Sequence, residues 1–164
     1  MSINLPGYAP PPVGFEAPLE MLSACHARIE QQCATLQRLV RHVAGHGTDA
    51  QARSAAAGVM RYFDTAAVDH HADEEMDLFP ALIEAMAGSD AVCLRELTAG
   101  LAQVAVAATT SLDADAIAAF VGIYQRHIAR EEGELLPMAA RLLDDDALDR
   151  VGRAMRERRG VAPV

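Results

Sequence analysis

Two stretches of this sequence place a histidine and a glutamate four residues apart, beside apolar residues and a proline. The first is HHADEEMDLFP at residues 70–80, and the second is HIAREEGELLP at residues 127–137. In a helix, residues four apart lie on one face, one turn from each other, so the histidine and glutamate of each stretch can reach the same centre. Neutral imidazoles and carboxylates are good ligands for iron, manganese or zinc. The chemistry that this spacing predicts is metal coordination.

The apolar residues around each pair share its helical phase, which predicts that both pairs face a core. The seam of the first stretch reads Phe63, Ala67, His70, Glu74, Leu78 and Leu82. The seam of the second reads Ile117, Phe120, Tyr124, His127, Glu131, Leu135 and Met138. A third seam, within residues 22–43, contains His26. The alternative for each pair is a solvated surface contact worth about 0.3 kcal/mol.

A cation would explain why two carboxylates and three imidazoles share a core. A buried carboxylate without a partner either costs several kcal/mol or takes up a proton. Taken alone, His26 would be interpreted as a core histidine hydrogen-bonded to a neighbour, and the other four residues favour a ligand instead. The five candidate metal ligands are His26, His70, Glu74, His127 and Glu131.

Several neighbouring residues are candidates for lining the pocket or supporting the ligands. His71 and Glu75 repeat the four-residue spacing one position later, and we expect them either on the outward side of the helix or behind the ligands, where they would support them without touching the metal. Glu132 stands in the same relation to the second pair. Tyr124 lies one turn before His127, so its ring is expected to pack in the core, with a hydroxyl near the metal as the alternative.

Four long helices are needed to hold these seams together. The pattern predicts helices at about residues 17–47, 49–86, 89–110 and 111–143, and a short basic helix at about residues 146–158. Long amphipathic helices with short connections predict an all-α fold, an antiparallel up-down four-helix bundle. Pro80 and Pro137 should bend or break the second and fourth helices, because proline lacks the N–H and clashes with the preceding turn.

The chain divides into three predicted parts. Residues 1–16 contain four prolines and two glycines, which predicts an extended N-terminal arm. Residues 17–143 form the bundle, and residues 144–164 form a short C-terminal helix and tail. The run DRVGRAMRERRG at residues 149–160 is basic. We expect a solvated terminal helix there, with a docking surface for an acidic partner as the alternative.

Charge and cysteine content narrow the class of protein. The formal net charge is −9, from 23 acidic and 14 basic residues, and such a surface repels nucleic acid. An odd number of unclustered cysteines (Cys25, Cys33 and Cys93) argues against a disulfide framework and for a reducing compartment. No apolar run approaches membrane-spanning length. We expect a cytoplasmic monomer or homodimer without nucleic-acid or membrane partners.

Taken together, these residues resemble the hemerythrin-like family, the HHE cation-binding domains. The family pattern has a histidine on helix 1, His-x-x-x-Glu-Glu-x-x-Leu-Phe-Pro on helix 2, a histidine on helix 3, and a second His-x-x-x-Glu on helix 4. The resemblance covers residues 19–143 and implies a non-haem di-iron centre with two bridging glutamates. It also implies roles in binding oxygen or nitric oxide, iron handling or redox sensing. The matching ligands are His26 on helix 1, His70 and Glu74 on helix 2, and His127 and Glu131 on helix 4.

One element of the family pattern is missing, because residues 81–126 contain no histidine. The expected histidine follows the first Leu-Phe-Pro by about six helical turns, and Leu101 stands near that place. One metal should then lose a terminal ligand. Three outcomes stay open: an asymmetric di-iron centre with an extra open position, a single metal held mainly by His26, His70 and the carboxylates, or substitution by Glu96 or another group.

We therefore expect a metal-binding protein with one or two iron ions per chain, zinc and manganese being alternatives, that binds or senses a diatomic gas or handles iron. A di-iron oxidase or peroxide-reducing enzyme is the alternative, because an open position on a metal is where a small substrate binds. A second alternative is a degenerate, metal-poor structural bundle in which Leu101 marks decay of the site.

Overall fold

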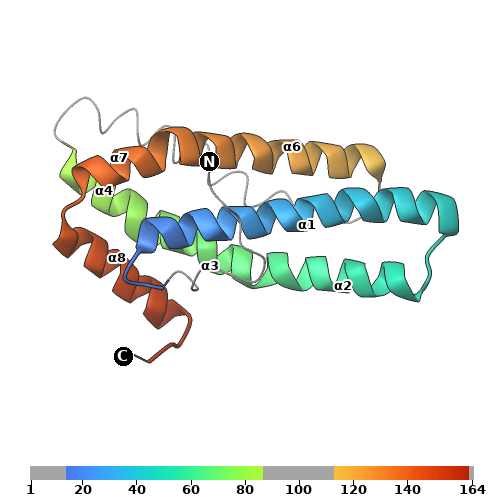
Figure 1. Cartoon of the computed structure of the whole chain (residues 1–164), viewed down its shortest axis with the longest axis horizontal. Coiled ribbons are helices and arrows are strands. Elements are labelled where there is room, and N and C mark those ends of the chain that lie inside the picture. Colours follow the sequence, from blue (N-terminus) through green and yellow to red (C-terminus); the bar gives the residue numbers. More distant parts are fainter. Residues whose placement is uncertain (1–13, 87–112, 163–164) are drawn as a thin grey trace, which may run out of the picture.

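The structure is a computed structural model of the chain, and it describes residues 14–86 and 113–162 (Figure 1). These residues fold into helices, as the all-α prediction requires. The helix expected at residues 89–110 and most of the arm expected at residues 1–16 lie outside the described residues. Within the described residues, no helix is long and apolar enough to cross a membrane. The α-helices are α1 (Pro18–His46), α2 (Ala50–Asp64), α3 (Ala66–Asp73), α4 (Phe79–Ala85), α6 (Ala114–Arg130), α7 (Leu136–Leu142) and α8 (Asp145–Arg158).

Local chemistry sets where these helices begin and end. Pro18 occupies the first turn of α1, where its missing N–H costs nothing. Gly47 ends α1 in the left-handed region, at φ 74°, which a side chain would disfavour. Asp49 then accepts a 2.7 Å hydrogen bond from the Ala52 amide and caps α2. After this turn α2 returns along α1 (Figure 1). Aspartates cap two later helices in the same way, Asp113 at α6 and Asp144 at α8.

The second helix is interrupted at a residue where the sequence predicts continuity. Thr65, with φ −129° and ψ −82°, separates α2 from α3. Its hydroxyl donates a 2.7 Å hydrogen bond to the carbonyl oxygen of Arg61, one turn earlier. Such a bond competes with the regular backbone ladder and bends helices. The prediction of one helix from residue 49 to residue 86, bent only at its proline, was therefore wrong at this position.

Both prolines are accommodated by a π-helical turn rather than by a break. The turns are η1 (Glu74–Leu78) and η3 (Glu131–Leu135), and each begins at a candidate glutamate ligand. In each turn the amide after the last residue bonds to that glutamate's carbonyl oxygen, five residues back. The wider turn comes just before Pro80 and Pro137, and the chain stays helical through both prolines. Of the bend or break expected at each proline, the break does not occur, because the π turn relieves the clash with the preceding turn.

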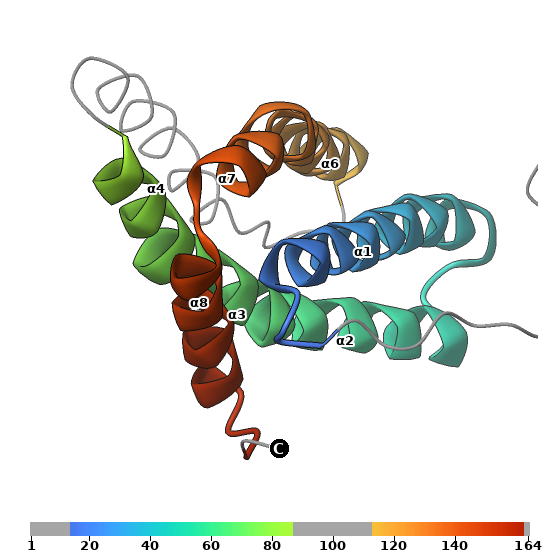
Figure 2. The same cartoon turned by 60° about the vertical axis from the view of Figure 1, so that its left-hand side comes forward.

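Two apolar clusters fill the interior, one toward each end of α1. The first contains Leu22, Leu78, Leu82, Leu135 and Met155, and the second contains Ile29, Cys33, Ile117, Val121 and Ile128. The candidate ligands lie at intermediate positions along the same helices. Helix α8 crosses α3 and packs against α1 and η1 (Figure 2). A side chain at Gly152 would overlap the carbonyl oxygen of Phe15, so this glycine permits the close approach of α8 to the segment before α1.

Candidate metal centre

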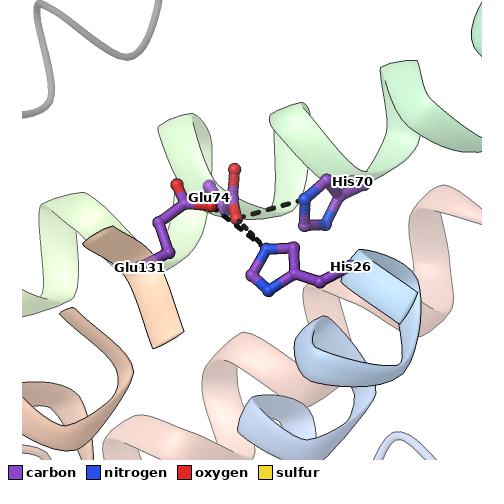
Figure 3. Close-up of side chains that lie close together, drawn as sticks. All are labelled: His26, His70, Glu74 and Glu131. Carbon is purple, nitrogen blue, oxygen red and sulfur yellow. Dashed lines mark ion pairs between the residues drawn. The ribbon is translucent and has the colours of Figure 1, made fainter. Parts of the chain in front are cut away.

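Four side chains from three separate parts of the chain converge in the interior. His26 comes from α1, His70 from α3, and Glu74 and Glu131 from the first residues of η1 and η3. One ligand atom from each lies within 4.8 Å of the others. Figure 3 shows the two imidazoles directed at the two carboxylates. All four side chains are buried, with exposed fractions of 2% or less.

The polar atoms of this cluster lack the hydrogen bonds that buried polar groups normally make. Nε2 of His26 lies 3.1 Å from Glu131 Oε2 and 3.5 Å from Glu74 Oε1, and Nε2 of His70 lies 3.3 Å from Glu74 Oε1. These approaches lack hydrogen-bond geometry, so among the described residues these nitrogens and Glu74 Oε1 have no hydrogen-bond partner. Two imidazoles and two carboxylates with their donor atoms facing one centre fit a cation of the iron, zinc or manganese class.

His127 lies beside this group and contacts it through one member. Its Nε2 is 3.0 Å from Glu131 Oε2, and its side chain is buried. The same oxygen is 3.1 Å from His26 Nε2. The Glu131 carboxylate therefore stands between imidazoles from α1 and from α6, where a bridging ligand would be placed.

Glu132 lies in a position that supports a candidate ligand, which the sequence left open as the alternative to an outward position. Oε1 of Glu132 lies 2.6 Å from Nδ1 of His26. The hydroxyl of Ser23 donates to the same carboxylate, 2.7 and 2.8 Å from its two oxygens. A carboxylate on one ring nitrogen fixes the imidazole and leaves the other nitrogen for a metal. The helical period could not reveal this, because the partner is on another helix.

In the metal-free cluster, His26 and Glu74 are expected to keep their protons at neutral pH, in the place where a cation would bind. Burial disfavours the charged form of His26, but hydrogen-bond-range contacts with Glu131, Glu74 and Glu132 outweigh it and raise its pKa to about 10. Burial raises the pKa of Glu74 to about 8, despite the nearby His26. Burial also acts to raise the pKa of Glu131, but His127 and His26 overcome it and lower the pKa to about 2. A metal ion would replace the two protons on His26 and Glu74.

Two further histidines are neutral at pH 7, the form that binds metal. Burial lowers the pKa of His70 well below its ordinary value, and the neighbouring His26 and His71 add to the effect. Burial likewise lowers the pKa of His71 to about 4, assisted by His127. Both rings can therefore offer a nitrogen lone pair without first losing a proton.

Of the two positions expected for His71, outward or behind the ligands, the structure shows the ring turned toward the interior. Its ring is half-buried and packs beside Tyr124, with ring centroids 6.0 Å apart. Tyr124 is buried and also contacts Phe63 and Phe120, which accords with core packing. Glu75, in contrast, is exposed. Leu101 and Glu96, which bear on the missing histidine, lie outside the described residues.

Between pH 6.5 and 8 the metal-free protein is expected to lose stability as the pH rises. Unfolded, His26 loses its proton near pH 6.5 and Glu74 near 4.5, whereas folded they keep it to about 10 and about 8. The folded state binds more protons across this window, so the free energy of unfolding falls. His70 and His71 are neutral in the folded state but half protonated near pH 6.5 in the unfolded state, so they oppose the change in the lower part of this window, by less than His26 and Glu74 contribute.

The expected loss is on the order of 2 kcal/mol, measured by urea unfolding in the presence of a chelator. The variant His26→Gln should reduce the slope, because it removes one of the two protons. The variant His46→Gln, at the exposed end of α1, should leave the slope unchanged. A free energy of unfolding that rises or stays level over this range would contradict the assignment of protons to the cluster.

Comparison with known proteins places this geometry in a family. The sequence profile described as "Hemerythrin HHE cation binding domain" matches residues 17–139. A protein of Haemophilus influenzae, described only as an uncharacterized protein, is 31% identical over 161 residues, and the similarity covers 90% of this chain and 92% of that protein. The profile match includes all five candidate ligands, and together with the buried cluster it indicates binding of a metal ion.

Proposed function

We propose that this chain, which belongs to the hemerythrin HHE cation-binding domain family, is a non-haem iron protein that binds or senses a diatomic gas or handles iron. The observation that carries the proposal is the set of buried imidazole and carboxylate atoms that face one another without hydrogen bonds among the described residues. Such an arrangement is costly in the absence of a cation. The proposed ligands are His26, His70, Glu74, His127 and Glu131.

The donor set favours iron over the other candidates. It combines imidazoles with two carboxylates, and in the described part of the chain no cysteine joins it. Cys25 and Cys33 are buried, and burial raises the pKa of both thiols, which disfavours the thiolate. Mixed histidine and carboxylate sets with positions left for an additional ligand are typical of non-haem iron. Zinc and manganese remain the alternative metals. When bound, iron would supply an open coordination position for a small molecule such as oxygen or nitric oxide.

A cavity beside the site is of a size that suits a small ligand. Its volume is about 120 Å³, and it is lined by both polar and apolar side chains of α1 and α6, among them Glu30, Cys33, Tyr124 and Gln125. The ring of Tyr124 that lines this cavity also packs against His127, with ring centroids 6.2 Å apart. Tyr124 therefore contacts both the pocket and the candidate ligand His127.

Several finer expectations belong with this proposal. The up-down antiparallel bundle, with its third helix at residues 89–110, is inferred from the sequence together with the return of α2 along α1. The boundaries of the N-terminal arm and the C-terminal part also stay predictions. The same holds for the monomeric or homodimeric state, the cytoplasmic location and the lack of nucleic-acid partners.

Anaerobic thermal unfolding with and without Fe(II) tests the proposal. Because metal binds the folded state, Fe(II) at one hundred times its Kd should raise the free energy of unfolding by about 2.7 kcal/mol. The variant Glu131→Gln should abolish most of this increase, and His46→Gln should retain it. Oxygen or nitric oxide added to the iron-loaded protein should then change its optical spectrum. No iron uptake and no thermal shift in the wild-type protein would refute the proposal.

A further inference from the structure

We propose that His71 is a ligand for a second metal ion, which it would share with His127 and the Glu131 carboxylate. This inference rests on the proposed function, because it concerns the same buried centre. It assigns a metal-binding role to a residue that helical periodicity places on the outward side. Residues 81–126 contain no histidine, although the family pattern has one there. His71 would replace that missing ligand.

The position of His71 allows it to serve a different ion from its neighbour. Consecutive residues of an α-helix point about 100° apart, so His70 and His71 cannot both approach one point from the same direction. His70 faces His26 and Glu74, whereas the ring of His71 lies against His127. The two adjacent histidines of α3 therefore serve two separate parts of the centre.

The two pairs of imidazoles have similar geometry. The rings of His26 and His70 are T-shaped, with centroids 4.8 Å apart and planes at 87°. The rings of His71 and His127 are also T-shaped, with centroids 5.8 Å apart and planes at 81°. Two imidazoles bound to one ion at metal–nitrogen distances of about 2.1 Å place their centroids roughly 5–6 Å apart. Both pairs are close to that separation.

The nitrogen atoms of the second pair are available for a ligand. Nε2 of His71 and both ring nitrogens of His127 are buried and have no hydrogen-bond partner among the described residues. A buried polar atom left without a partner normally destabilises the folded state. Stacking on Tyr124 would explain the position of the ring but not the unpartnered nitrogen. A cation bound by both imidazoles accounts for position and nitrogen together.

Glu131 lies where it can serve both ions. Its Oε2 is 3.1 Å from His26 Nε2 and 3.0 Å from His127 Nε2, while its Oε1 has no hydrogen-bond partner in the described part of the chain. Each ion would then have two imidazoles, and the carboxylate would bridge them. In this arrangement His71 of α3 supplies the imidazole that, in the family pattern, comes from the third helix of the bundle, expected here at residues 89–110.

Counting the iron bound by His71 variants tests this inference. Wild-type protein, His71→Gln and the control His46→Gln would be dialysed anaerobically against Fe(II), and bound iron per chain measured by mass spectrometry. We expect two ions in the wild type and the control, and one in His71→Gln with an affinity for that ion within about threefold of wild type. His71→Glu, which returns a donor atom, should recover the second ion, whereas a pure packing role would not be rescued by a carboxylate.

The outcomes separate this inference from the proposed function. Two ions bound by His71→Gln at wild-type affinity, or one ion bound by both proteins, would overturn the role of His71 and leave the iron centre standing. A wild-type protein that binds no iron would instead refute the proposed function and this inference with it. Circular dichroism would verify folding, and His71→Ala would replace any variant that fails to fold.

Discussion

Metal-free protein carrying Glu74→Gln is expected to be more stable than the wild type at pH 7 and unable to hold iron at the site. In the folded protein Glu74 is 1% exposed, and burial raises its pKa to about 8. At pH 7 the unfolded chain carries this carboxyl ionised, so folding requires the uptake of a proton. Glutamine has a similar shape and needs no proton. The amide thus removes a cost of folding and also removes the anionic ligand.

The expected gain is on the order of 2 kcal/mol, or about 4–8 °C in melting temperature for a chain of this length. It would be measured by thermal unfolding in a chelator, alongside anaerobic Fe(II) titration. Glu75→Gln is the matched control, because the same change one residue later falls on an exposed side chain. That control should change neither quantity. A loss of stability in Glu74→Gln, or iron binding at wild-type affinity, would disprove the account of Glu74 as a ligand held at a cost.

If Glu74→Gln raises the stability of the metal-free protein and lowers its affinity for iron, the result would also distinguish a metal centre from a structural core. A residue selected only for packing stabilises the metal-free fold, and its replacement normally destabilises the protein. A ligand is retained despite its cost in the empty state, because the cation removes that cost when it binds. The buried carboxylate atoms of Glu74 and Glu131, which have no hydrogen-bond partner among the described residues, are what we expect of such ligands.

The helical period of the sequence was sufficient to predict the burial of His26, His70, Glu74, His127 and Glu131. It was sufficient because each of these residues lies on an apolar seam of its own helix, before any irregular turn. Beyond Leu135, which is fully buried as predicted, the period of this seam fails by one residue. The seam predicted Met138 in the core, but Ala139 is fully buried and Met138 only partly so. The extra residue of the π turn shifts the buried face, and a constant period cannot include it.

The remaining differences between expectation and structure are contacts between helices. The bond from His26 to Glu132 joins α1 to η3, and the packing of His71 against His127 joins α3 to α6. A pattern that assigns inside and outside one helix at a time cannot locate such contacts. The same limit applies to the basic run at residues 149–160, for which the sequence predicted a solvated helix or an external acidic partner. In the structure, one face of this helix, with Val151 and Met155, is buried against the rest of the protein. The acidic partners of Arg158 are Asp73 and Asp77 of the same chain.

Replacing Arg158 and Arg159 together with alanine is expected to cost about 3–5 kcal/mol of stability. Both guanidinium groups donate to Asp73, which is completely buried, and Arg158 also donates to Asp77 at 2.7 Å. Burial raises the pKa of Asp73, and the two arginines oppose that rise. Without them the carboxylate would be an unpaired charge inside the protein or would have to take up a proton. Urea unfolding of the metal-free protein would measure the loss.

The cost should depend on which side of this contact is removed. Asp73→Asn leaves two arginine side chains that are 18% exposed, which water can partly hydrate, so its cost should be smaller than that of the double alanine variant. Adding Asp73→Asn to the double variant should recover part of the loss, because the buried charge is then gone. The double variant Arg150→Ala with Arg153→Ala changes exposed positions of the same helix and should stay within about 0.5 kcal/mol of wild type. Equal losses of stability in both double variants would contradict this account, because the loss would then follow from removing any two arginines of this segment and not from the contact with Asp73.

Because Asp73 immediately precedes Glu74, loss of its arginine partners should also weaken iron binding under conditions where the variant is still folded.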